Sequence, residues 1–220
     1  MCVRRRTVNV GDAVRQNGGG FYMEMDQERF RKQLAFILEI DKEKNILRQT
    51  HLTGHGRRED DADHAWHLAV MTWILREYSN QEIDIVRTIL MVLIHDIVEI
   101  DAGDTYAYDE EAKKTEADRE MKAAERIFGL LPEDQGRKLR EIWEEFDAYE
   151  TPEARFAHVM DNFQPMLLNN SNGGGDWREH GVNQSQVRQR NAKTGTGSEE
   201  IWSYMQEILA ENIRKGSLKP

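Results

Sequence analysis

The apolar run IVRTILMVLI, residues 85–94, ends directly in a histidine and an aspartate, His95 and Asp96. A segment that is apolar on nearly every side predicts a helix enclosed by other parts of the protein, because it has no polar face to present to water. We therefore expect a central buried helix over about 81–99. Three more carboxylates follow within eight residues, on Glu99, Asp101 and Asp104, and a helix that only filled a core would not need them.

Most of the remaining chain shows the same helical character. Apolar residues recur at intervals of three and four, as in the first segment with Phe30, Leu34, Ile37 and Leu38. No segment shows the convincing apolar–polar alternation that is typical of a strand. The sequence predicts an all-α fold, a single helical bundle, with helices over about 26–46, 61–79, 81–99, 109–128, 135–149, 152–169, 184–193 and 198–214 and with loops at 48–60 and 169–183.

The net charge of the 220-residue chain is −10. Nucleic-acid partners require clustered lysine and arginine, so this charge argues against them. A small anion such as a nucleotide is still compatible with the charge, because a metal ion and one or two arginines can supply local positive charge.

The N-terminal segment, residues 1–24, mixes arginine, asparagine and glycine without periodicity and is predicted to be a disordered extension. The packed domain is expected over residues 25–216. The single cysteine, Cys2, permits no disulfide within the chain, and no window approaches the ~20 apolar residues of a membrane span. We expect a cytoplasmic protein with no membrane partner.

The His95-Asp96 pair is a candidate for metal binding. A charged aspartate at the end of a buried helix needs compensation, and buried carboxylates are normally paired or bound to metal. Further ligands have to come from other helices, and the candidates are His64 in DADHAWHLA and Asp161, which interrupts the apolar side of the helix at 152–169. Two imidazoles and two carboxylates form a mixed nitrogen and oxygen site, which suits a divalent ion such as Mn, Co, Fe or Zn.

The ordered set of His64, His95-Asp96 and Asp161 resembles the H…HD…D signature of HD-domain metal-dependent phosphohydrolases. The segments EDDADHAWHLA, HDIVEIDAGDT, MDNFQPML and WREHGV resemble the branch that contains the bacterial 5′-deoxynucleotidase and its eukaryotic relatives. The likeness extends over roughly residues 26–215.

This resemblance implies roles for particular residues. It implies that His64, His95, Asp96 and Asp161 bind the metal, and that Glu99 and Asp104 serve the chemistry at an activated water and a leaving oxygen. Glu99 lies four residues after His95, so on a regular helix it would share its face. Arg48 resembles the family's phosphate-contacting arginine, and Arg57 and Arg58 are further candidates for substrate binding. Two of these residues also have simpler interpretations, since Asp104 could cap the next helix and Arg48 could complement a helix dipole.

The expected function is hydrolysis of (deoxy)nucleoside 5′-monophosphates by a metal-activated water. The small-molecule nucleotide is the expected partner, and the resemblance together with the long, partly apolar helices also implies a possible homodimer. Two alternatives are an HD phosphohydrolase for another phosphate ester, such as a nucleoside triphosphate or a cyclic or alarmone nucleotide, and a helical module that binds a nucleotide without turnover.

Overall fold

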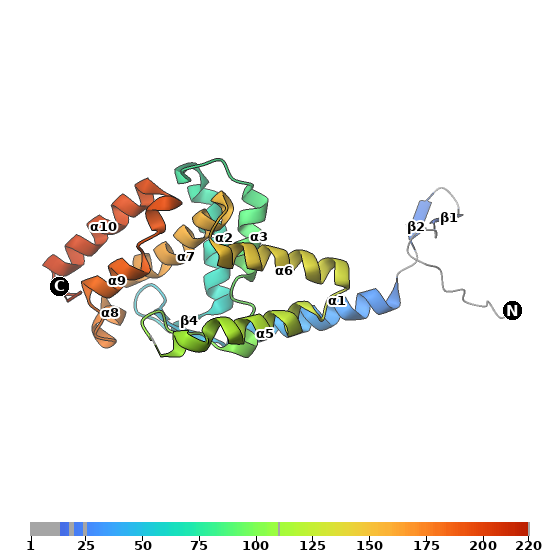
Figure 1. Cartoon of the computed structure of the whole chain (residues 1–220), viewed down its shortest axis with the longest axis horizontal. Coiled ribbons are helices and arrows are strands. Elements are labelled where there is room, and N and C mark those ends of the chain that lie inside the picture. Colours follow the sequence, from blue (N-terminus) through green and yellow to red (C-terminus); the bar gives the residue numbers. More distant parts are fainter. Residues whose placement is uncertain (1–13, 18–19, 24–25, 110, 220) are drawn as a thin grey trace.

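The computed structural model describes residues 14–17, 20–23, 26–109 and 111–219. Within these ranges the chain forms a helical bundle, so the predicted all-α class is confirmed (Figure 1). Four short 3-10 segments add to the helices, at Asp41–Asn45, Arg76–Tyr78, Ala112–Thr115 and Thr194–Thr196. The α-helices are α1 (Gln27–Ile40), α2 (Asp61–Leu75), α3 (Ile85–Ile94), α4 (Glu99–Ala102), α5 (Glu116–Phe128), α6 (Glu133–Ala148), α7 (Pro152–Ser171), α8 (Gly175–Glu179), α9 (Gln184–Arg190) and α10 (Glu199–Arg214).

Two small antiparallel hairpins accompany the helices where no strand was expected. One pairs β1 (Val14–Asn17) with β2 (Gly20–Met23), and these eight residues belong to the segment predicted to lack regular structure. Residues 1–13, 18, 19 and 24 of that segment lie outside the described residues. The other hairpin pairs β3 (Leu47–His51) with β4 (Arg58–Asp60) inside the predicted loop. Each strand is at most five residues long, and none of the four sequences VRQN, GFYM, LRQTH and RED alternates between apolar and polar residues, so periodicity gave no sign of them.

The start of α2 places the first candidate ligand in the interior. Asp60 caps the helix, accepting a 2.8 Å hydrogen bond from the amide of Asp63, whose side chain in turn accepts a bond from the amide of Asp60. Such a reciprocal cap satisfies two backbone amides at the start of the helix. It fixes the helix so that His64 lies in the first turn and is fully buried.

The hydrophobic core forms where α2, α3, α6 and α7 pack together. Met91 and Val92 on α3 and Phe156 and Met160 on α7 are inaccessible to solvent. The expectation of a central helix before the His-Asp pair is met by α3, which contacts three neighbouring helices. None of the described helices combines the length and the apolarity that crossing a bilayer requires.

The helix before the His-Asp pair is shorter than predicted. It ends at Ile94, and a tighter turn follows in which the amide of Glu99 donates to the carbonyl of Asp96, three residues back, at 2.8 Å. The apolar run is also not enclosed on every side, because Val86 is 72% exposed. The turn matters for the site, because it sets the directions of the polar side chains that follow it.

Helix α1 lies at the edge of the body and leads to the N-terminal hairpin (Figure 1). The predicted helix is present, but the apolar residues that were expected to mark its buried face are exposed, Leu38 at 73%, and Phe36 is the residue that it buries. A two-bond ion pair from Arg29 to Asp134, with distances of 2.7 and 2.9 Å, ties α1 to the start of α6.

Candidate metal centre

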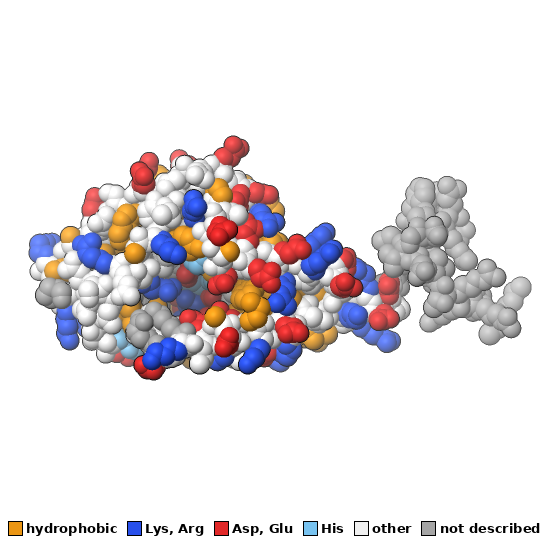
Figure 2. Space-filling view, viewed as in Figure 1, with side chains coloured by type: hydrophobic (Ala, Val, Ile, Leu, Met, Phe, Trp, Pro, Cys, Tyr) orange, Lys and Arg blue, Asp and Glu red, His pale blue; other side chains and the backbone are white. Residues whose placement is uncertain are grey.

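A cavity of about 200 Å³ opens beside the His-Asp turn. The space-filling view shows a hollow on this face of the body, in which acidic and histidine side chains are visible (Figure 2). The lining is strongly acidic. Its aspartates and glutamates among the described residues are Asp96, Glu99, Asp104, Glu116, Glu120, Asp161 and Asp176.

The structure brings together the four residues predicted to bind a metal. Suitable atoms of His64, His95 and Asp96 lie within 4.8 Å of one another, and all three residues are buried. Asp161 on α7 joins them, with Oδ1 at 3.2 Å from Nε2 of His64 and at 3.8 Å from Nε2 of His95. Residues from α2, α7 and the turn after α3 therefore meet at one point, and His95, Asp96 and Asp161 line the cavity there.

His95 is oriented by the backbone of α3, the helix that ends just before it. Its Nδ1 lies 3.0 Å from the carbonyl oxygen of Val92, so Nδ1 carries the proton and donates it. Nε2 is then turned toward the other candidate ligands, 3.2 Å from Oδ1 of Asp96. This buried nitrogen has no hydrogen-bond partner among the described residues.

His64 is oriented by two residues that sequence reasoning missed, Gln164 and Glu59. The amide nitrogen of Gln164 donates to Oε2 of Glu59 at 2.8 Å, so its carbonyl oxygen faces Nδ1 of His64 at 3.1 Å. Nδ1 of His64 must therefore carry the proton, and Nε2 presents its lone pair to Asp161. The position of Gln164, three residues after Asp161 on one helical face, was the available sequence signal.

These orientations fit a cation between the four residues. Burial and the charge of Arg48 lower the pKa of His64 to about 4, so this imidazole is neutral and its Nε2 faces a carboxylate oxygen, acceptor against acceptor. For His95, burial opposes the charged form, but Asp96 and Asp161 prevail and raise the pKa to about 9. A cation between Nε2 of His64 and Oδ1 of Asp161 would satisfy both facing acceptors, and the raised pKa of His95 shows that Asp96 and Asp161 favour positive charge at this point. Two imidazole nitrogens with two carboxylates are a donor set for a divalent transition metal.

Glu99 and Asp104, the two predicted catalytic residues, both line the cavity. The tight turn places Glu99 nearly in line with Asp96, three residues earlier, which corrects the expectation of a regular helical step from His95. Burial and the charges of Asp96 and Asp61 raise the pKa of Glu99 well above its usual range. Gly103 ends α4 with a φ of 76°, which is open to glycine at little cost, and the chain then turns so that Asp104 reaches the cavity.

Arg48 reaches the cavity but is occupied by carboxylates. Its Nη1 lies 2.6 Å from Oδ2 of Asp96 and 3.3 Å from Oδ1 of Asp61, and its Nε lies 4.0 Å from Glu59. A phosphate would therefore compete with these carboxylates for the guanidinium of Arg48. In this arrangement it chiefly orients a candidate metal ligand.

The other two predicted substrate-binding arginines do not join the site. Arg57 pairs with Asp63 at 2.6 Å and Arg58 pairs with Glu179 at 3.4 Å, and neither lines the cavity. Arg190 on α9, which the sequence analysis did not single out, lies in the cavity wall with Nη2 at 3.4 Å from Oδ2 of Asp161. No local pattern marks it, because only the packing of α9 against the site brings it there.

Aromatic side chains form another part of the wall. Tyr106 packs against His180 with ring centroids 4.9 Å apart and edge-on against Tyr108 at 5.3 Å. Trp177, from the predicted loop at 169–183, is buried beside them. The cavity thus has a polar end with the candidate ligands and an aromatic wall.

Comparisons with known proteins agree with this geometry. A family model described as the HD domain matches residues 40–202. The chain is 29% identical to human 5′-deoxynucleotidase HDDC2 over 138 residues, or 62% of this chain and 66% of that protein. It is 33% identical to the mouse protein of the same name over 109 residues, or 50% of this chain and 53% of that one. The matched part therefore spans less than two thirds of the length of either relative.

Solved structures extend the likeness over most of the chain. A predicted metal-dependent phosphohydrolase from Magnetospirillum magnetotacticum superposes with a TM-score of 0.83 at 46% identity, covering 87% of this chain and 96% of that one. A conserved hypothetical protein from Pyrococcus furiosus shares the fold, with a TM-score of 0.55 at 22% identity over 82% of this chain and 99% of its own. The matched family model, together with the convergence of the His-Asp pair with His64 and Asp161, shows that the chain belongs to the HD-domain family.

Proposed function

We propose that the protein is a metal-dependent phosphohydrolase that converts (deoxy)nucleoside 5′-monophosphates to nucleoside and phosphate. The observation that carries this proposal is the meeting of two oriented imidazole nitrogens with Asp96 and Asp161 at the wall of a cavity that Glu99 and Asp104 also line. The names of the relatives, 5′-deoxynucleotidase and predicted metal-dependent phosphohydrolase, support the same chemistry.

His64, His95, Asp96 and Asp161 would hold the ion. A divalent ion bound there supplies positive charge to offset the phosphate and lowers the pKa of a water toward ~7. Glu99 takes up the proton of the attacking water at Oε2, a buried atom without a hydrogen-bond partner among the described residues. The raised pKa of Glu99 makes this oxygen a better proton acceptor.

Asp104 serves the other side of the reaction. The water oxygen attacks phosphorus, the bond from phosphorus to O5′ breaks, and O5′ requires a proton. Burial raises the pKa of Asp104, which keeps a proton on this carboxyl at higher pH than usual and suits it to donate to O5′.

Arg190 provides the positive charge that the substrate needs in an acidic cavity. Arg48 and Arg190 are the two arginines in the described lining, and Arg48 is already held by Asp96 and Asp61. Arg190 makes one long contact, at 3.4 Å to Asp161, so it is freer to turn a pair of donors toward a phosphate. We assign the main phosphate contact to Arg190 and a supporting one to Arg48.

The aromatic wall favours a nucleotide over a smaller phosphate ester. Tyr106, Tyr108 and His180 offer ring faces and edges on which a base or sugar can pack. A site for a simple phosphate ester would have no use for this surface.

The decisive experiment is phosphate release from a panel of nucleotides by the full-length protein loaded in turn with Mn, Co, Fe and Zn. We expect turnover of 5′-monophosphates, and Glu99→Gln should lower it by about 100-fold or more while the bound metal stays. If only a triphosphate, cyclic or alarmone nucleotide were turned over, the protein would be a phosphohydrolase for that ester and not for 5′-monophosphates. Tight nucleotide binding without turnover in every metal-loaded sample would reject an enzymatic role.

We also propose that the protein forms a homodimer, as the family resemblance implies. Helix α2 carries four exposed apolar side chains at helical spacing, Trp66, Val70, Trp73 and Ile74. Exposed apolar patches of this kind mark contact surfaces on proteins. The assignment of one HD domain to residues 25–216 and the cytoplasmic location stay predictions.

A further inference from the structure

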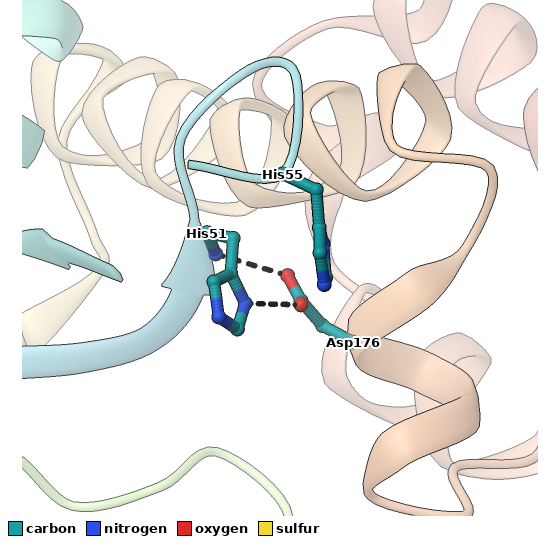
Figure 3. A group of neighbouring side chains, drawn as sticks. All are labelled: His51, His55 and Asp176. Carbon is teal, nitrogen blue, oxygen red and sulfur yellow. Dashed lines mark hydrogen bonds and ion pairs between the residues drawn. The ribbon is translucent and has the colours of Figure 1, made fainter. Parts of the chain in front are cut away.

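A second group of metal-binding side chains lies beside the aromatic wall, apart from the His-Asp turn. His51 ends β3, His55 lies in the loop between β3 and β4, and Asp176 lies in the first turn of α8 (Figure 3). One suitable atom from each residue lies within 4.8 Å of the others. The two rings stack with centroids 4.5 Å apart, and both side chains approach the carboxylate.

The carboxylate of Asp176 is nearly enclosed, with 4% of the residue exposed. Its Oδ2 accepts the backbone amide of His51 at 3.0 Å, and its Oδ1 lies 2.6 Å from Nδ1 of the same residue. A buried carboxylate needs charge compensation. No lysine or arginine is paired with it among the described residues, so the histidines are the groups that face this charge.

The loop that carries the two histidines is held in place by α7. Asn172, just after that helix, accepts the amide of His55 at 3.0 Å through its side-chain oxygen. Its amide nitrogen donates to the carbonyls of His51 and Leu52 at 3.2 and 3.1 Å. The ring of His55 also fits closely over Gly175, where an added Cβ would lie 3.2 Å from the ring. The histidines are therefore placed toward Asp176 before any ligand arrives.

We propose that His51, His55 and Asp176 form a second divalent-metal site, separate from the His-Asp centre. Two imidazoles and one carboxylate are three protein ligands of the kind that bind Zn²⁺ or Co²⁺, with a remaining position for water. The ion takes the place of the proton that Nδ1 of His51 and Oδ1 of Asp176 share. His55 is exposed, so an ion can reach the site from solvent.

A metal at this position links the β3–β4 loop to α8. Asp176 also lines the catalytic cavity, and Gln49 and Thr50, which precede His51 on β3, line it too. The second ion therefore fixes one wall of the substrate cavity without touching the four residues of the first site.

The test is a metal count on the full-length protein. Stripped protein is titrated with Zn²⁺ by calorimetry and with Co²⁺ by visible absorption, in the wild type, in His55→Ala and in Thr53→Ala. Thr53 is an exposed residue of the same loop and serves as the matched control. We expect two equivalents for the wild type and for Thr53→Ala. For His55→Ala we expect one equivalent at unchanged affinity and the other weakened by about 100-fold or more.

Asp96→Ala separates the two sites. It should lose the equivalent that His55→Ala keeps, and Zn²⁺ should still raise the melting temperature of Asp96→Ala but not that of Asp96→Ala combined with His55→Ala. A single equivalent in the wild type that depends on Asp96 would overturn the proposal. Equal stoichiometry and affinity in the wild type and His55→Ala would overturn it as well. The readout is binding, so it is independent of whether the protein hydrolyses any nucleotide.

Discussion

Arg48 donates a 2.6 Å hydrogen bond from Nη1 to Oδ2 of Asp96. The bond holds one oxygen of Asp96 and leaves Oδ1 directed at Nε2 of His95, 3.2 Å away. The arginine itself is braced by Asp61 and Glu59, which are almost entirely buried. Arg48 therefore acts as a positioning residue for a candidate metal ligand, and it balances a group of buried carboxylates.

Arg48→Met should weaken metal binding. Loss of a group that orients a ligand typically lowers metal affinity about 10- to 100-fold. The substitution should also lower the free energy of unfolding by about 3 to 5 kcal/mol, because the buried Asp61 and Glu59 lose their partner. Chelator competition and urea unfolding measure the two effects. Arg57→Met is the control, since Arg57 is a partly exposed arginine outside the cavity, and an Arg48→Met variant that matched it in both assays would contradict the assigned role.

Glu99→Gln and Asp101→Asn should behave differently although they lie two residues apart. Glu99 lines the cavity, whereas Asp101 is held by Arg126, with Nη2 at 2.8 Å from Oδ1. We expect Glu99→Gln to lower kcat by about 100-fold or more with the metal content unchanged, because the proton acceptor is gone. Asp101→Asn should keep kcat within about threefold, since its surface ion pair contributes little. Steady-state kinetics measures kcat, and elemental analysis measures the metal content. Equal losses of kcat in the two variants would show that Glu99 has no special role in the mechanism.

Arg190→Met should raise KM for a nucleoside 5′-monophosphate by about 10- to 100-fold, because a charge-assisted bond to phosphate is lost. Arg188→Met on the same helix should leave KM unchanged, because Arg188 is exposed and lies outside the cavity lining. Inhibition by inorganic phosphate should weaken in parallel with the rise in KM. If Arg190→Met left both KM and the inhibition by phosphate unchanged, Arg48 and not Arg190 would make the main contact with the phosphate.

His158 should make the stability depend on pH. Its ring is stacked against Phe146 at 3.9 Å and Tyr149 at 4.2 Å, and Nε2 faces the carbonyl oxygen of Phe146 at 2.9 Å. Burial lowers its pKa from 6.5 to about 4. As the pH falls, the unfolded chain takes up a proton on His158 at a higher pH than the folded protein does. The stabilising contribution of the buried neutral ring is therefore fully present above pH 6.5 and is lost as the pH falls toward 4.

Between those pH values His158 should reduce the free energy of unfolding by up to about 3 kcal/mol. His158→Gln should make this part of the profile shallower, and the buried His64, whose pKa is also lowered to about 4, should supply the slope that remains. The measurement is urea unfolding of the metal-free protein at a series of pH values. A profile of His158→Gln that runs parallel to that of the wild type would show that another group is responsible.

Trp73→Glu should disrupt the proposed dimer, because it places a charge in the middle of the apolar stripe of α2. Trp73 is 53% exposed, so the substitution should leave the fold of the monomer intact. Tyr204→Glu on α10, 49% exposed, is the matched control on another surface. Sedimentation velocity should show a dimer for the wild type and Tyr204→Glu and a monomer for Trp73→Glu. A wild type that sediments as a monomer would reject the homodimer.

Much of the fold followed from periodicity. The helical class and the approximate positions of the long helices were predictable, because apolar residues three and four apart have no other way to share one buried face. The ends were less accurate. The sequence predicts that the helix before His95 continues to about residue 99, whereas the structure ends it at Ile94 and winds the next residues more tightly. Local pattern carries no signal for that change.

For the candidate metal centre, too, one part could be predicted from the sequence and another part could not. The sequence by itself predicts four candidate metal ligands. The cost of burying a charge in an apolar helix singles out the His95-Asp96 pair and Asp161, and the family resemblance implies His64 as the fourth. Only the tertiary structure decided how they are used. In the structure both histidine Nε2 atoms face carboxylates, and Gln164, which is hydrogen-bonded to Glu59, orients His64. Arg48 donates to Asp96, and Arg190 lies in the cavity wall beside Asp161. These relationships join residues far apart in the chain, and their directions depend on how helices pack, which spacing along one chain does not encode.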